Sequence, residues 1–308
     1  PISIPFLFKD KIKTAVLNAA NEKLNATVDI KDFGLNLFSN FPNATLSLND
    51  ASVVGVGDFQ KDTLLSAKSA SVTIDLMSLF GSEYNISKIN LDKASIYTKV
   101  LEDGRANWDI MKVDSTASAS TESESAFKLN LKKITVNDCS FVYQNDSTKM
   151  KVTLNKWNGD LHGDFSASET TLNTNSTIGE VTFVMNGIPY LNKIQGVADA
   201  TINANLDKMQ FSFKESNLQL NDLKASIDGT FAMVGKDYED MEFDLKLNAP
   251  DTQFKDILSL VPAMYTADFK DVKTSGTAKL EAYIKGLMHG DSYPAFDVKI
   301  IEIGRAHV

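Results

Sequence analysis

The chain has 308 residues, of which 31 are basic and 40 acidic, giving a formal net charge of −9. Its only arginines are Arg105 and Arg305, so the guanidinium groups that favour phosphate and base-edge recognition are almost missing, and we expect no nucleic-acid partner. One cysteine and three histidines exclude a disulfide framework and a cysteine-based zinc site. We therefore expect no catalytic residues, no metal and no cofactor.

The N-terminal region reads as an apolar segment followed by a helix. Pro1–Phe8 is mostly apolar, but a membrane-spanning helix needs about 20 such residues, so this segment cannot span. It is consistent with the end of an anchor whose upstream part is missing, or with an ordinary apolar strand. Over 9–24, apolar residues recur every three or four positions, which predicts an amphipathic helix. We assign 1–25 to the end of the anchor and this helix.

Beyond this helix the hydrophobic period changes to two. Apolar and polar residues alternate over 71–76, 201–207 and 209–214, which predicts antiparallel strands with one apolar and one solvated face. Roughly fifteen strands at ~4.8 Å spacing would extend about 70 Å. We divide this β-rich body into a first part, 26–112, and a continuation, 128–301.

Three other segments interrupt or follow the strands. Leu76–Phe80 and Thr252–Leu260 are short apolar segments with helical spacing, and the second is either a plug for the sheet's apolar face or simple packing. The segment 113–127 is rich in Ser, Thr and Glu and holds few large apolar residues, so we expect a flexible loop. The segment 302–308 resembles a translated sequencing adapter, and we expect a non-native tail.

An internal repeat is visible in the strand-rich part. Leu46–Val53, Ile89–Ile96 and Ile134–Phe141 share one pattern, and Leu218–Ile227 is a looser copy with a two-residue insertion. Each copy predicts a strand, a polar bend and a second strand, as expected for a stacked supersecondary unit. Cys139 takes the place of an alanine in two other copies, so we interpret it as a small packing residue rather than a reactive thiol.

Few residues suggest chemistry. His162 lies two residues before Asp164, and a histidine–carboxylate pair can activate a nucleophile, so a hydrolase that uses His162 is one hypothesis. No motif supplies a positioned nucleophile, however, and His289 is interpreted as a loop residue. Gly55–Gly57 lacks the third glycine and the following helix of a dinucleotide site.

The predicted sheet has more apolar surface than its few helices could cover. If the sheet curls, its apolar face becomes a long trough that suits acyl chains, because a polar substrate would need placed donors and acceptors. A two-layer sandwich or a solenoid with a filled core explains the pattern equally well. Ten residues are candidates for the wall of a trough and for lipid contact: Val72, Ile74, Ile89, Leu91, Ile202, Leu206, Phe211, Phe213, Phe231 and Phe243.

A series of segments, in order from Pro1 to about Ile301, resembles the AsmA family. These segments are Ile4–Ile12, Phe41–Ala44, Asp62–Leu65, Asp103–Trp108, Leu260–Tyr265 and Pro294–Phe296. AsmA-like proteins resemble the chorein, or bridge-like, lipid-transfer proteins. We therefore expect a mainly β fold, in which an elongated, curled antiparallel sheet forms a repeating β-groove, with a short N-terminal helix and one or two further short helices.

The same resemblance implies a function and a location. It implies an anchor in the bacterial inner membrane, with the bulk of the chain in the periplasm, and a role in outer-membrane biogenesis. We expect a protein without enzymatic activity that transports phospholipid, with its acyl chains held in the apolar trough; the membrane and envelope proteins are its other expected partners. The alternative is a scaffold or assembly factor for outer-membrane proteins that carries no lipid. In either case we expect this chain to lack the anchor and a C-terminal part.

Overall fold

The computed structural model describes residues 13–14, 17–18, 21–22, 24–75, 77–80, 84–110, 112, 127–235, 240–260, 276–290 and 292–302. The described residues between 13 and 22 are helical, in agreement with the predicted N-terminal helix. The apolar segment 1–8, the loop residues 113–126 and the tail residues 303–308 lie outside the described residues.

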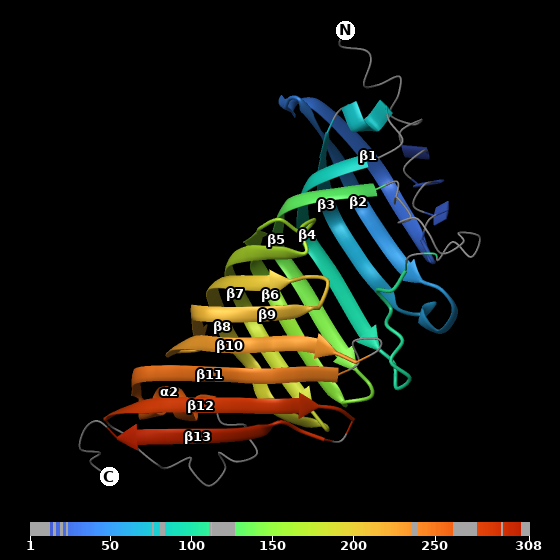
Figure 1. Cartoon of the computed structure of the whole chain (residues 1–308). Coiled ribbons are helices and arrows are strands. Elements are labelled where there is room, and N and C mark those ends of the chain that lie inside the picture. Colours follow the sequence, from blue (N-terminus) through green and yellow to red (C-terminus); the bar gives the residue numbers. More distant parts are fainter. Residues whose placement is uncertain are drawn as a thin grey trace.

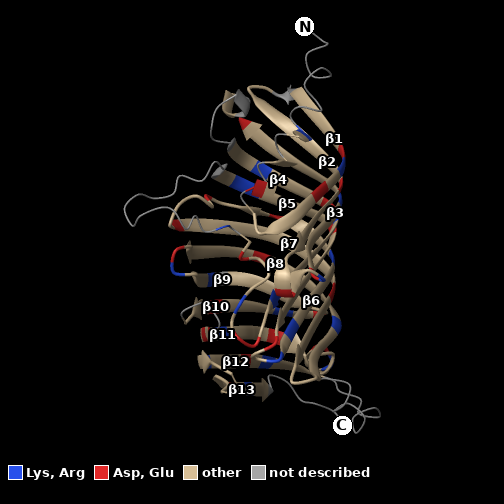
Figure 2. Ribbon diagram, turned by 90° about the vertical axis from the view of Figure 1, so that its right-hand side faces the viewer, with Lys and Arg blue, Asp and Glu red and all other residues tan. Residues whose placement is uncertain are grey.

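Thirteen described strands form one sheet in which each strand lies beside its neighbour in the sequence (Figure 1). They stack along an elongated body, with the first and the last strand at opposite ends (Figures 1 and 2). This confirms the predicted mainly β architecture. The strands are β1 (Ala26–Asn40), β2 (Asn43–Gly55), β3 (Thr63–Asp75), β4 (Tyr84–Val100), β5 (Phe127–Asn145), β6 (Met150–His162), β7 (Glu169–Met185), β8 (Ile188–Asn205), β9 (Gln210–Leu220), β10 (Leu223–Val234), β11 (Asp240–Gln253), β12 (Thr277–Met288) and β13 (Ala295–Glu302).

Short helices lie between some of the strands. The 3-10 helix η2 (Met77–Phe80) and the helix α2 (Phe254–Leu258) lie within the two segments predicted to be helical. A further 3-10 helix, η1 (Gly57–Phe59), connects β2 to β3 and was not predicted.

One strand pair departs from the antiparallel arrangement. β4 and β5 run parallel, with Leu91 beside Val136, whereas the other neighbouring pairs of described strands are antiparallel. A parallel pair needs a connection of a dozen or more residues that crosses from one end of the strands to the other. The connection over 101–126 provides this length, so the sheet is mixed at this one position.

The predicted repeat marks a bend that recurs in three strands. Asp50 in β2, Lys93 in β4 and Asp138 in β5 have φ values of 48°, 49° and 50°, in the left-handed region that polar residues tolerate better than branched ones. The looser copy differs, because Asn221 lies in the turn between β9 and β10 rather than inside a strand. Only the three closer copies therefore form the predicted strand, bend and strand.

A row of small buried side chains follows these bends. Ala51 lies opposite Ala67, Ala67 lies opposite Ala94, and the backbone N–H of Ala94 donates to Cys139 Sγ at 3.4 Å. Cys139 is 1% exposed and packs in a cluster with Ala67 and Ala94, with Trp157 against it. The interpretation of Cys139 as a packing residue is confirmed.

Candidate functional site

One face of the sheet carries rows of apolar side chains that continue from strand to strand. Because opposite residues in neighbouring strands share a face, the strand register defines these rows directly. One row crosses β3 to β6 with Val72, Ile89, Ile134 and Leu161. A longer row crosses β2 to β8 with Val53, Leu65, Ile96, Phe141, Leu154, Val181 and Ile194. We call this surface the apolar face.

Most side chains of the longer row are half-buried rather than buried. Ile194 is buried, whereas the other six members of the row keep intermediate exposure. A fully packed core would bury such residues. This part of the apolar face therefore remains accessible to a small apolar group.

The opposite face is polar and is cross-linked by side-chain hydrogen bonds. Asn90 Nδ2 donates to Ser71 Oγ at 2.9 Å, and Thr201 Oγ1 donates to Asn173 Oδ1 at 2.9 Å. Asn137 Nδ2 donates to Asp92 Oδ1 at 2.6 Å. Amide, hydroxyl and carboxylate groups of this kind suit contact with water, so this face is the solvated one. We call it the outer face.

Of the ten predicted wall residues, nine lie in strands on the apolar face, and Leu206 lies in the turn that follows β8. Ile74 is only 3% exposed and packs against Phe33 and Leu46, so it is a core residue here. The other nine are half-buried. Phe211, Phe231 and Phe243 form a ladder with ring centroids 6.1 and 5.3 Å apart.

The two ends of the strands form two rims, and the rims meet at one place. We call rim 1 the strand ends that carry the β5–β6 and β7–β8 turns, and rim 2 the opposite ends, which carry the β10–β11 and β12–β13 connections. Met150 on rim 1 is buried in one cluster with Met241 and Met288 on rim 2. Asn186 Nδ2 on rim 1 donates to Tyr293 Oη on rim 2 at 2.5 Å. The sheet therefore curls far enough to close on itself at this point.

The interior is filled where the rims meet. Tyr143, Phe183, Met185, Phe231 and Phe243 pack against the three buried methionines. The structure therefore combines the two alternatives, an open trough and a filled core. The apolar face is accessible along the half-buried row, but the protein's own side chains fill the interior at this methionine cluster (Met150, Met241 and Met288). Phe231 and Phe243, predicted as wall residues, belong to this filled section.

The helix α2 covers a second part of the apolar face. Ile257, together with Leu260 just after the helix, packs on Ala225, Ala249 and Leu280 of β10 to β12. The predicted segment therefore lies on the apolar face and shields it at the rim-1 ends of these strands.

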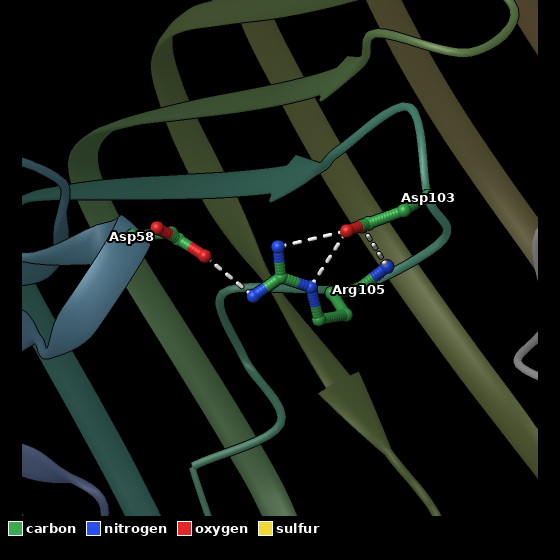
Figure 3. A network of polar contacts seen from close by, with 3 residues as sticks. All are labelled: Asp58, Asp103 and Arg105. Atoms are coloured by element: carbon green, nitrogen blue, oxygen red, sulfur yellow. Dashed lines mark hydrogen bonds and ion pairs between the residues drawn. The ribbon is translucent and has the colours of Figure 1, made fainter.

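The segment after β4 is held along rim 1 by the only arginine in the described part of the chain. Arg105 Nε donates to Asp103 Oδ2 at 2.8 Å, and Arg105 Nη1 donates to Asp58 of η1 at 2.5 Å (Figure 3). These hydrogen bonds lower the pKa of the Asp103 carboxyl and raise the pKa of the guanidinium. The arginine thus links the segment to the connection between β2 and β3.

The same segment brings a partly exposed aromatic side chain, Trp108, against Tyr143. Asn107 is buried, donates to Tyr97 O at 2.7 Å and accepts from Lys99 N at 2.8 Å, so its amide fixes the segment to β4. Trp108 follows, and its ring lies 6.2 Å from that of Tyr143, which packs against the methionine cluster. Trp108 is the last residue of the Asp103–Trp108 segment that resembles the AsmA family, but sequence periodicity does not predict where its side chain lies.

The two histidines in the described part of the chain lie away from the apolar face. His162 Nε2 pairs with Asp160 on the outer face of β6, because Leu161 between them points to the apolar face. The expected partner Asp164 instead pairs with Lys132, which lowers its pKa to about 2. His289 Nδ1 lies 2.6 Å from Asp240 on rim 2.

Metal binding and membrane crossing are two other roles that the described residues could have. No group of three or more His, Cys, Asp or Glu side chains among these residues is arranged to hold a metal ion. Among the described helices, none combines the length and the apolar character needed to cross a membrane.

An elongated single sheet with one apolar and one solvated face defines a protein class suited to long apolar ligands or to extended assemblies. The sequence profile of the AsmA family matches residues 5–179, more than half of the chain, and the chain belongs to this family. Membership indicates a function related to the cell envelope and its lipids. Comparison with curated proteins and with solved structures gave no match.

Proposed function

We propose that this protein carries phospholipid along the apolar face, with the acyl chains against the sheet and the headgroup in water at a rim. The observation that supports the proposal is the row of half-buried apolar residues that continues from β2 to β8. Burying each CH₂ group contributes about 0.8 kcal/mol, so a chain can be held without any specific polar contact. Family membership adds the envelope context.

The mechanism is passive movement. The longer row presents no charged group and no donor or acceptor side chain, so nothing fixes an acyl chain at one position. A chain can therefore slide between equivalent apolar contacts while the headgroup follows the rim. We further propose that an N-terminal anchor in the inner membrane holds the body in the periplasm. In this location the protein would contribute to outer-membrane biogenesis. No catalytic step is part of this mechanism.

Native mass spectrometry with and without phospholipid vesicles tests the proposal. The wild-type chain is expected to retain phospholipid, and Ile89→Asn on the apolar face is expected to reduce the bound fraction about threefold or more, because a polar amide replaces a lipid contact. Lys88→Asn, on the outer face of the same strand, is the matched control and is expected to retain lipid. Circular dichroism checks that both variants fold. A wild-type chain without lipid under all these conditions would contradict the proposal.

A scaffold without lipid is the second candidate function. The filled section at the methionine cluster and the cover provided by α2 favour it, because they shorten the accessible part of the apolar face. Absence of bound lipid, together with capture of outer-membrane proteins by the purified chain, would support the scaffold. Protease accessibility after permeabilising the outer membrane tests the periplasmic location that both candidates share.

A further inference from the structure

A cavity of about 750 Å³ lies on rim 1, where the ends of β4, β5 and β6 meet. Its size is within the range of ligand sites in proteins. Two of its lining residues also contact the filled section of the interior. Met150 belongs to the buried methionine cluster, and Asn145 Nδ2 donates to Tyr143 Oη at 3.3 Å. The cavity therefore lies at the water-exposed border of this apolar section.

The charged side chains around this cavity have both signs. Asp103 is occupied by Arg105, and Asp146 is occupied by Lys99 at 3.3 Å and by Gln144 Nε2 at 2.7 Å. Glu102, Lys149 and Lys151 also line the cavity. Lys149 already has an interaction partner, whereas neither Glu102 nor Lys151 makes a side-chain hydrogen bond or an ion pair with any other described residue. One carboxylate and one ammonium are thus available to a ligand.

From this arrangement we propose that the cavity binds a phosphoethanolamine headgroup, with its phosphate near Lys151 and its ammonium near Glu102. The inference rests on the proposed function, because it assumes that the acyl chains of the same lipid lie against apolar side chains of the protein. A phosphate and a primary ammonium match one lysine and one carboxylate through charge-assisted hydrogen bonds. The headgroup then stays hydrated at the rim while its chains lie against apolar side chains.

The lining also indicates which headgroups fit less well. A glycerol headgroup carries the phosphate but no cation, and would leave Glu102 unpaired beside its negative charge. A choline headgroup is recognised by aromatic faces, and none of the residues that line the cavity is aromatic. Ethanolamine is therefore the expected preference over both.

The test offers the chain vesicles with equal amounts of ethanolamine, glycerol and choline phospholipids of identical acyl chains, and reads the bound lipids by native mass spectrometry. The wild type is expected to enrich the ethanolamine lipid about threefold over its share, as expected for partly exposed ion pairs. Glu102→Gln and Lys151→Gln are each expected to remove the enrichment while the total bound lipid stays the same. Glu242→Gln and Lys214→Gln, exposed on β11 and β9, are the matched controls and are expected to keep it.

The outcomes separate this inference from the proposed function. Bound lipid in the same proportions for the wild type and all four variants would overturn the headgroup site but leave lipid carriage standing. No bound lipid in any sample would overturn both. Soluble glycerophosphoethanolamine in excess is expected to leave the bound ratio unchanged, since the acyl chains provide most of the free energy of binding. A loss of enrichment in its presence would assign the cavity to the free ester and overturn the lipid-borne site.

Discussion

At the scale of single residues, the structure depends on small side chains beside the bends. Ala51, Ala94 and Cys139 directly follow the positive-φ residues of the three repeat copies, and each is buried. The side chains of neighbouring strands converge at such a bend, so volume matters more there than chemical type. The single cysteine is thus explained by its size, since it replaces an alanine in a row of alanines.

Substitutions at Cys139 test this explanation. Cys139→Ala is expected to change the free energy of unfolding by less than about 1 kcal/mol, because alanine occupies the same place in the other two copies. Cys139→Leu is expected to destabilise by about 1–3 kcal/mol, because it overpacks the cluster with Ala67 and Trp157. Urea unfolding measures both. Equal stability of the alanine and leucine variants would contradict a packing role.

A pH dependence is expected at the β6–β7 connection. Lys132 and Ser166 lower the pKa of Asp164 to about 2, from an ordinary value of 3.8. A depressed carboxyl pKa stabilises the folded state above the unfolded pKa, and this contribution is lost as the pH falls from about 4 towards 2. Asp164 is exposed, so the effect on global stability is small. A carboxyl titration by NMR is expected to give a midpoint near 2 in the wild type and a higher midpoint in Lys132→Gln, still below 3.8 because the hydrogen bonds from Ser166 remain; equal midpoints would contradict the ion pair.

At the scale of elements, the sequence pattern predicted strands well and their directions less well. The period of two over 71–76, 201–207 and 209–214 identifies strands that the structure contains, except that residues 206–209 form the turn between β8 and β9. The parallel pair β4 and β5 escaped prediction because alternation contains no information on strand direction. The direction of β5 relative to β4 depends instead on the connection over 101–126, and the composition of this connection predicts only a loop.

The packing of α2 on the apolar face can be tested with paired substitutions. Ile257→Ala is expected to destabilise by about 1–2 kcal/mol, because a half-buried side chain leaves Ala249 and Leu280 partly uncovered. Lys255→Ala, on the exposed side of the same helix, is expected to be neutral. The free energy of urea unfolding gives both values. A loss for Lys255→Ala as large as that for Ile257→Ala would contradict the assignment of the packed side.

The hold of Arg105 on the rim-1 segment can be tested by proteolysis. Arg105→Ala removes the hydrogen bonds to Asp58 and Asp103, so cleavage within 101–110 is expected to become faster while global stability stays unchanged. Limited proteolysis with mass-spectrometric mapping measures the effect. Lys68→Ala, exposed on β3, is the control. Unchanged cleavage would contradict the role of Arg105 in holding the segment.

At the scale of the whole molecule, the main surprise is that the rims meet. Met150 and Met241 lie far apart in the sequence and on opposite rims of the sheet, so no local pattern links them. Their contact results from the curl of the entire sheet. The sequence pattern does not determine this curl, because it is compatible with both a trough and a filled core. The structure combines an accessible row over β2 to β8 with a filled section at the methionine cluster.

Closure of the rims can be measured by chemical cross-linking. In a Cys139→Ala background, Asn186→Cys and Tyr293→Cys together are expected to be joined by a short bis-maleimide, because the native side chains are within hydrogen-bond distance. A disulfide is a poorer probe, since it requires Cα atoms within about 7 Å. The cross-link is expected to disappear in urea. Equal cross-linking of folded and unfolded chains would contradict closure, and a cross-link that blocks lipid uptake would show that lipid enters between the rims.

The central claim is that one face of the sheet contacts lipid and the other contacts water. A photo-reactive amino acid placed at Ile89 lies on the apolar face, and the same amino acid at the next residue, Asn90, lies on the outer face. After illumination with phospholipid vesicles, the account predicts a lipid adduct at position 89 and none above background at position 90. Equal labelling at the two positions, or labelling only at position 90, would contradict it.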